Sequence, residues 1–172
     1  MTKRNVHYEV AFEDYLRSKT LPYVAVDETK KALFGEIALK SFDFIVYSES
    51  GDNLLVDVKG RKFPDSLPGR RDHLRAWENW ITQDDADSLR QWSNVFGSEF
   101  NPLLVFAYWI QGPPQRSPFE DLHLFRKHHY AFMGVDLESY LALARPRSES
   151  WSTLSVPSRE FSTLAHDVLE YL

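Results

Sequence analysis

The chain has 172 residues, of which 43% are hydrophobic and 15% aromatic, and it contains no cysteine. This length fits one domain with a sizeable core, and the lack of thiols excludes a disulfide framework and a thiolate metal site. The net charge of −5 argues against a protein that coats nucleic acid, yet six Lys or Arg lie between residues 59 and 75 against two Asp. Such a local basic stripe can hold phosphate groups.

The sequence shows neither a secretion signal nor a membrane span. Residues 1–19 carry charges throughout, which is unlike a signal peptide. No run approaches the roughly 20 apolar residues that a membrane helix needs. We therefore expect a soluble, cytoplasmic protein without membrane contact.

The first half of the chain predicts one helix and three strands. Apolar residues recur at helical spacing over residues 5–20, and Pro22 ends this helix. Residues 23–28 resemble a short strand, whereas 30–41 are ambiguous. Residues 42–49 and 53–60 are apolar runs separated by Ser-Gly-Asp, which is typical of a hairpin.

The second half predicts a helix, a buried strand and further elements. Residues 73–82 fit a short helix or a strand; Thr82 and Gly97 then bound a well-signalled helix. The continuous apolar run 101–110 favours a buried central strand. Beyond it we expect a strand at 130–137, a helix at 136–145, an irregular segment at 145–158 and a closing helix capped by Ser158. This order predicts an α/β (α+β) fold, a mixed sheet flanked by helices.

Three charged residues interrupt the apolar strands of the predicted hairpin. Asp57 and Lys59 share one face, since side chains alternate along a strand. If Ser50–Asp52 form a three-residue turn, Asp43 lies opposite Lys59 and diagonal to Asp57. A one-residue change of turn length would move Asp43 to the other face.

Two explanations account for these charges. The simple one is a buried salt bridge. The functional one is a site for a hard cation, because Mg²⁺ takes carboxylate ligands together with water and substrate phosphate. The neighbouring lysine would then hold the water that attacks a phosphodiester.

The pattern resembles the PD-(D/E)XK nuclease superfamily, whose signature is an acid on one strand and an acid-x-lysine triplet on the next. Here these are Asp43 and Asp57-Val58-Lys59. The order helix, three strands, helix, strand over residues 6–110 is similar to the restriction-endonuclease-like core of that superfamily. The chain departs from it in having Phe42 where proline precedes the first acid, and aspartate rather than the commoner glutamate in the triplet.

The chain looks most similar to Holliday-junction resolvases of the archaeal type, in which a glutamate of the first helix joins the metal site. That resemblance implies a role for Glu9, with Glu13, one turn on, as the second candidate. It further implies that Asp43, Asp57 and the Val58 carbonyl bind Mg²⁺ or Mn²⁺, that Lys59 orients and polarises the attacking water, and that cleavage leaves a 5′-phosphate.

Residues after the triplet are candidates for contacts with nucleic acid. Arg61, Lys62, Arg70 and Arg71 would border the cleft of a nuclease, although ordinary surface charge explains them equally well. Gln91 lies on the second core helix, where some superfamily members carry a supporting glutamine or lysine. An exposed helical glutamine is the alternative for that position.

The sequence thus predicts a magnesium-dependent endonuclease, a hydrolase acting on DNA. The main alternative is a catalytically inactive nuclease-fold module that binds nucleic acid or a protein partner; the third is an unrelated α+β protein with an ordinary salt bridge. We expect a single domain over 1–172, with a nuclease-like core at 1–112 and a C-terminal extension at 113–172 that packs on it. Surplus aromatic residues, and the two-fold sites typical of the family, favour a homodimer.

Overall fold

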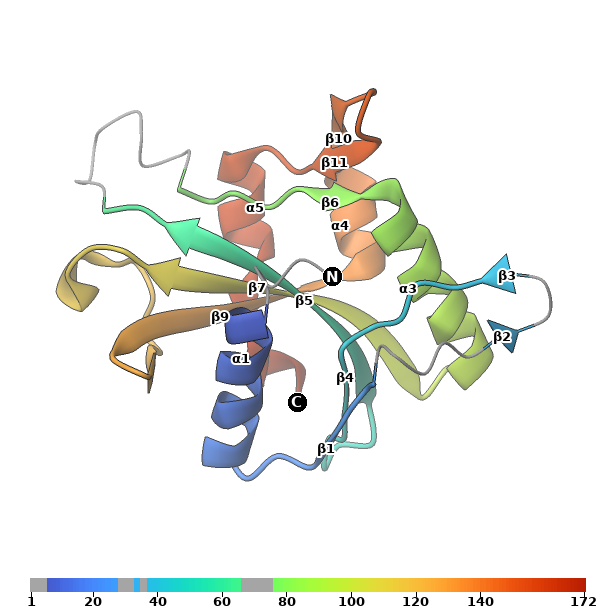
Figure 1. The fold of residues 1–172 in the computed structure, drawn as a ribbon, viewed down its shortest axis with the longest axis horizontal. Helices are drawn as coiled ribbons and strands as arrows, with labels where there is room; N and C mark the ends of the chain where they lie inside the picture. Colours follow the sequence, from blue (N-terminus) through green and yellow to red (C-terminus); the bar gives the residue numbers. More distant parts are fainter. Residues whose placement is uncertain (1–5, 28–32, 35–36, 66–75) are drawn as a thin grey trace.

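The computed structural model describes residues 6–27, 33–34, 37–65 and 76–172, with a twisted sheet at its centre (Figure 1). The helices and 3-10 turns are α1 (Val6–Ser18), α3 (Gln83–Phe96), η1 (Pro114–Arg116), α4 (Leu137–Leu143), α5 (Ser158–Leu164) and η2 (Val168–Tyr171). The strands are β1 (Tyr23–Ala25), β2 (Leu33–Phe34), β3 (Ile37–Ala38), β4 (Phe44–Val46), β5 (Asn53–Phe63), β6 (Ile81–Thr82), β7 (Phe100–Ile110), β8 (His123–Phe125), β9 (His128–Asp136), β10 (Arg145–Ser148), β11 (Thr153–Ser155) and β12 (His166–Asp167).

Within the described residues, the main sheet has seven strands in the order β1-β4-β5-β7-β9-β12, with β8 beside β9. Its centre is the parallel pair β5 and β7, which runs from Asn53 opposite Phe100 to Phe63 opposite Ile110. A parallel pair needs a crossover, and α3 supplies it. The predicted fold class and the order of core elements are confirmed.

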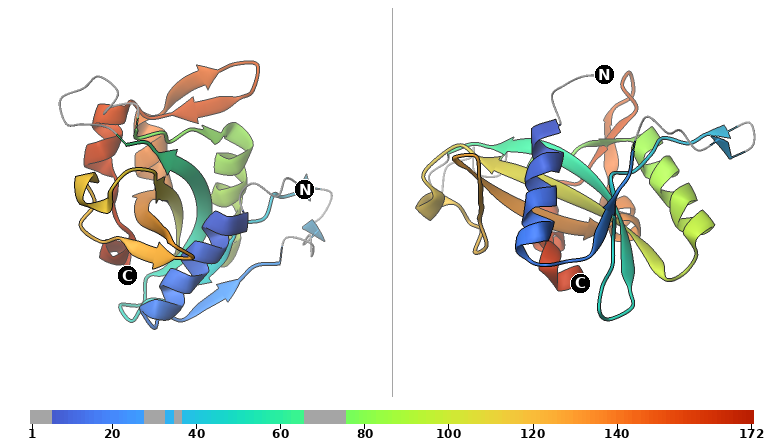
Figure 2. Two further views of the ribbon diagram at one scale, coloured as in Figure 1. Left: turned by 60° about the vertical axis from the view of Figure 1, so that its left-hand side comes forward. Right: turned by 60° about the horizontal axis from the view of Figure 1, so that its bottom comes forward.

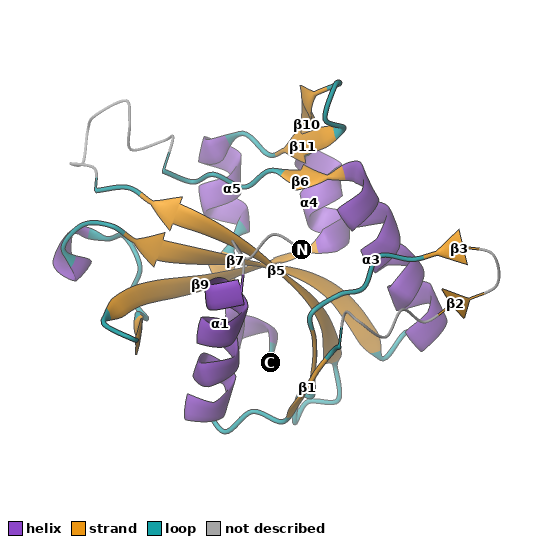
Figure 3. Ribbon diagram, viewed as in Figure 1, coloured by secondary structure: helices purple, strands orange, loops and turns teal. Residues whose placement is uncertain are grey.

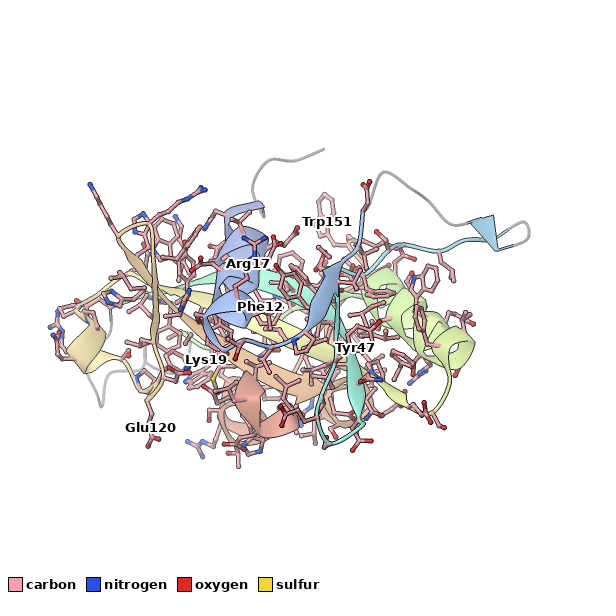
Figure 4. All side chains as sticks on the ribbon, turned by 90° about the horizontal axis from the view of Figure 1, so that it is seen from below. Phe12, Arg17, Lys19, Tyr47, Glu120 and Trp151 are labelled. Atoms are coloured by element: carbon pink, nitrogen blue, oxygen red, sulfur yellow. The ribbon has the colours of Figure 1, made fainter. Side chains whose placement is uncertain are left out.

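Helices cover both faces of the sheet, which explains why the central strands are almost continuously apolar (Figures 2 and 3). On one face, Phe12 of α1, labelled in Figure 4, points toward the sheet. Its ring packs against those of Phe44 and Phe132. On the other face, α3, α4 and α5 contribute buried residues to a second core, among them Leu89 and Phe161. Each face of the sheet therefore has its own apolar core.

Two predictions for the C-terminal third are wrong. The segment expected to be irregular contains the antiparallel pair β10 and β11, and β11 also pairs with β6. The closing helix ends at Leu164, and its N-cap residue is Pro157 rather than Ser158. Ala165 is buried in the core beneath α3 and Val168 in the core beneath α1. The chain crosses the sheet edge between them and pairs with β9 as β12, which a continuous helix could not do.

Residues 113–172 contribute β9 and β12 to the main sheet and place α4 and α5 against it. The proposed division of the chain at residue 112 stays a prediction. Among the described residues, the helices are too short or too polar to span a bilayer.

Candidate active site

The candidate site lies where β4 begins, beside the middle of β5. Phe44 pairs with Val56, and the N–H of Asp43, the residue before β4, donates a 2.9 Å hydrogen bond to the Val56 carbonyl. Asp43 therefore lies beside Asp57, with Lys59 two residues further along β5. The register of β4 against β5 is therefore shifted by two residues from the predicted one, in which Asp43 lay opposite Lys59. The loop is longer than expected because Ser48 forms local hydrogen bonds, such as the 3.3 Å bond from its backbone N–H to the Asn53 side chain, in place of ladder pairing. A shift of two preserves the face, so the three charges still lie together.

β4 pairs with β5 only as far as Val56, which leaves the edge of β5 open beyond that residue. Asp43 is hydrogen-bonded to this open edge. Its carboxylate accepts a 2.6 Å hydrogen bond from the Val58 backbone N–H, and its side chain is buried. The N–H and C=O groups of one strand residue point to the same side. The Val58 carbonyl therefore faces the same edge as the Asp43 carboxylate, the position that a metal ligand would need.

Lys59 is held between two carboxylates. Its ammonium lies 3.0 Å from Asp57 and 3.0 Å from Asp85, and all three side chains are nearly buried. Asp85 comes from the first turn of α3, where it forms a reciprocal capping box with Thr82. Lys40 also forms an ion pair with Asp85. The N-terminus of α3 is thereby fixed against β5.

Sequence reasoning missed Asp85 as a site residue. A signal was present, because Asp85 shares the inward stripe of α3 with Leu89 and Trp92, at spacings of four and three residues. A carboxylate on such a stripe is buried and therefore needs a cation or hydrogen-bond donors beside it.

The pKa values show how strongly these charges interact. Burial, the Asp57 carboxylate and Glu9 raise the pKa of Asp43 well above its ordinary value. Burial alone would lower the pKa of Lys59, but Asp57 and Asp85 outweigh it and raise that pKa. Burial alone would raise the pKa of Asp85, whereas Lys59 and Lys40 lower it overall. Lys59 therefore stays charged, while Asp43 and Asp57 repel each other.

The two glutamates of α1 have different surroundings. Glu9 acts electrostatically on Asp43. Glu13 forms a 2.9 Å ion pair with Arg17 and accepts a 2.9 Å hydrogen bond from Tyr23. The geometry thus favours Glu9 over Glu13 as the helix carboxylate of the site.

Among the described residues, those predicted to contact nucleic acid do not lie together in the structure. Arg61 is buried, donates to the Gly60 and Trp80 carbonyls and stacks 4.2 Å from the Trp80 ring. Its Nε has no hydrogen-bond partner among the described residues. Lys62 is exposed on the opposite face of β5, and Gln91 is exposed on α3, away from the Asp85 stripe. Arg70 and Arg71 lie outside the described residues.

The donor set suits a hard cation. Asp43 and Asp57 form a facing carboxylate pair whose repulsion a divalent ion would relieve. Over the described ranges, no three His, Cys, Asp or Glu side chains converge on one point as ligands would. The third oxygen would have to come from the Val58 carbonyl or from movement of Glu9.

Comparison with known proteins supports the fold. Neither a protein-family model nor a curated protein sequence matches the chain. A solved structure does match: Hjc of Archaeoglobus fulgidus, described as a Holliday junction resolvase from an archaeal hyperthermophile. The TM-score is 0.52 at 14% sequence identity, and the match covers 96% of this chain and 97% of Hjc. The predicted resemblance to such a resolvase is thereby confirmed as a likeness of fold, and it extends through the C-terminal third.

Proposed function

We propose that this chain, which has the fold of a Holliday junction resolvase, is a metal-dependent nuclease that hydrolyses phosphodiester bonds of DNA. The observation that carries the proposal is the buried cluster of Asp43, Asp57 and Lys59 at the open edge of β5. A fold by itself does not establish an activity, so the argument rests on these side chains.

The carboxylates would bind Mg²⁺ or Mn²⁺. Asp43, Asp57 and the Val58 carbonyl supply oxygens at one edge, and Glu9 completes the set directly or through water. When bound, such an ion supplies Lewis-acid stabilisation of the charge that develops on a phosphate group.

Lys59 would position the attacking water. Its ammonium has three donors, two of which point to Asp57 and Asp85, and the third can hold a water or a phosphate oxygen. Because its pKa is raised, Lys59 stays protonated and does not act as a general base. Asp85 and Lys40 act at one remove, by holding Lys59 in place.

A second candidate function is an inactive nuclease-fold module that binds nucleic acid or a protein. The shorter aspartate at position 57, in place of the usual glutamate, favours it. Metal dependence separates the two, since an inactive module should bind DNA equally with and without Mg²⁺. Assembly as a homodimer, matching the two-fold symmetry of a branched junction, belongs to the first proposal and is tested by light scattering. The cytoplasmic location stays a prediction.

The test is cleavage of labelled linear, single-stranded and branched DNA with Mg²⁺, Mn²⁺ or EDTA. Asp57→Asn and Lys59→Met should abolish metal-dependent cutting. Asp52→Asn is the matched control, because it removes an exposed carboxylate from the loop of the same hairpin. No cutting by folded wild-type protein, with equal DNA binding in Mg²⁺ and EDTA, would refute the nuclease and support the binding module.

A further inference from the structure

A cavity of 300 Å³ lies between the start of α1 and the β8–β9 hairpin. Its lining consists of His7, Trp109, Phe125, Arg126, His128 and Tyr130. It belongs to the α1 face of the sheet, the side from which Glu9 approaches Asp43. None of the residues proposed above to hold metal or water lines it, so it is separate from the candidate active site.

The cavity walls are aromatic rings held at fixed angles. The Trp109 ring lies 4.9 Å from that of His128 and 5.4 Å from that of His7, both in edge-to-face arrangement. His7 is fixed by a 3.1 Å hydrogen bond between its Nδ1 and the Tyr130 hydroxyl. The half-buried Trp109 and the exposed His128 leave ring surface on which a flat aromatic group can stack.

Two cations, Arg126 in the lining and Lys62 beside it, lie at the same cavity although the whole chain is acidic. The Lys62 ammonium lies 5.6 Å from the Trp109 ring centre, and the Arg126 guanidinium stacks 4.8 Å from Phe125. Among the described residues that line it, none is Asp or Glu. Burial, His128 and Lys62 together lower the pKa of His7, as expected where positive charge gathers. The occupant should therefore be anionic as well as aromatic.

The turn between β8 and β9, which carries Arg126 and Lys127, has an unfavourable backbone. Arg126 and Lys127 both have positive φ, 45° and 69°. A two-residue hairpin turn normally has Asn-Gly at such positions, because bulky side chains are strained there. This turn retains two long cationic side chains in spite of the strain, which is a pattern found at functional sites.

We infer that this cavity is a subsite for one unpaired base of a DNA strand, with the flanking phosphates held by Lys62 and Arg126. The inference rests on the proposed function and adds a second point of contact to it. Along β5, Lys62 lies about 16 Å from Asp57 and on the opposite face, so a strand that contacts both passes round the open edge of β5. One strand can therefore reach both places within a few nucleotides. Base stacking on aromatic rings beside cations is the usual mode of single-strand binding.

The first experiment locates the base. A branched DNA with one 5-iododeoxyuridine in its unpaired arm is irradiated on full-length protein in EDTA, and the adduct is mapped by mass spectrometry. We expect the adduct on the lining residues of the cavity. Adducts found elsewhere, or none from a protein that does bind this DNA, would overturn the subsite.

The second experiment measures affinity by fluorescence anisotropy in EDTA. His128→Ala should weaken binding to the unpaired arm by about tenfold, because it removes one stacking ring. Arg126→Asn removes the charge and keeps a residue that tolerates positive φ. His129→Ala is the matched control, since it changes the next residue of β9, whose side chain points to the other face. Equal losses in His128→Ala and His129→Ala, or a preference for blunt duplex, would overturn the subsite.

The outcomes distinguish the two proposals. Binding at the cavity without metal-dependent cleavage would refute the nuclease and leave the subsite. Cleavage that is unaffected by the cavity variants, with no adduct there, would refute the subsite and leave the nuclease. A protein that neither binds nor cuts DNA would refute both.

Discussion

Replacing Asp57 by asparagine separates a metal site from an ordinary salt bridge. Lys59 has two carboxylate partners, Asp57 and Asp85, each 3.0 Å away. If both carboxylates serve only to pair cations, Asp57→Asn and Asp85→Asn should both destabilise the protein, and Asp85→Asn by no more than about 1 kcal/mol extra for its exposed partner Lys40. Asp57 also repels Asp43, so its removal has a second, favourable effect, and a metal site further predicts that Asp57→Asn loses any stabilisation by Mg²⁺.

The magnitudes follow from the structure. Asp85→Asn keeps an acceptor for the Thr82 cap but weakens the hold on Lys59, which should cost about 2–3 kcal/mol. Lys40, half exposed, adds less than about 1 kcal/mol. Asp57→Asn loses a similar interaction, yet it returns about 1.4 kcal/mol at neutral pH for each unit by which the pKa of Asp43 falls. We expect Asp57→Asn to lie within about 1 kcal/mol of wild type.

The assay is urea unfolding at neutral pH, followed by tryptophan fluorescence in EDTA and again with Mg²⁺. In EDTA the free energy of unfolding should be about 2 kcal/mol lower for Asp85→Asn than for Asp57→Asn. Mg²⁺ at about 100 times its dissociation constant should stabilise wild type by about 2.7 kcal/mol and leave Asp57→Asn unchanged. Equal destabilisation by both variants, with no effect of Mg²⁺ on wild type, would show that Asp57 only pairs Lys59.

Three further predictions follow from the same geometry. Lys59→Met should abolish cleavage and change DNA affinity in EDTA by less than about threefold. Because the pKa of Lys59 is raised, the wild-type rate of cleavage should not increase with pH as a lysine loses its proton. A pH–rate profile that requires a neutral lysine would contradict the assigned role. A Cβ at Gly60 would lie 2.0 Å from Cδ2 of Tyr8. Gly60→Ala should therefore lower the free energy of unfolding in urea by about 1–3 kcal/mol, and it should impair cleavage because it displaces α1 and with it Glu9. An unchanged urea midpoint would show that α1 accommodates the methyl group. The pKa of Asp43 is raised in the folded state, so the stability that Asp43 contributes is complete below the unfolded pKa of about 3.9 and is lost as pH rises through the folded pKa. In EDTA, Asp43→Asn should therefore gain stability relative to wild type from acid toward neutral pH. A stability difference that does not change with pH would contradict the shift.

The chemistry of the hairpin could be predicted because it depends on local periodicity. Alternation along β5 places Asp57 and Lys59 on one face whatever the rest of the chain does. The partner position of Asp43 could not be predicted, because the loop is closed by side-chain hydrogen bonds of Ser48 and Asn53 that no turn rule anticipates. The predicted register differs from the observed one by two residues, an even number, so Asp43 stays on the same face of the sheet as Asp57 and Lys59.

The contribution of α3 required the tertiary structure. The capping signal of Thr82 located the start of this helix correctly. That this start lies against Lys59 depends on how the crossover between β5 and β7 packs, which no local pattern encodes. Similarly, the break after Leu164 depends on pairing with β9 at Gly134, which overrides the helical spacing of the closing segment.

The parallel pairing of β5 with β7 also has a consequence for folding kinetics. Asn53 pairs with Phe100 and Phe63 with Ile110, so this ladder closes only after the intervening chain has been ordered. Contacts so distant in sequence form slowly, whereas the β4–β5 hairpin is local. We therefore expect Asp43, Asp57 and Lys59 to meet early on the folding pathway and Asp85 to join them late. Until α3 docks, the nascent hairpin presents an unpaired strand edge that is prone to association with other chains.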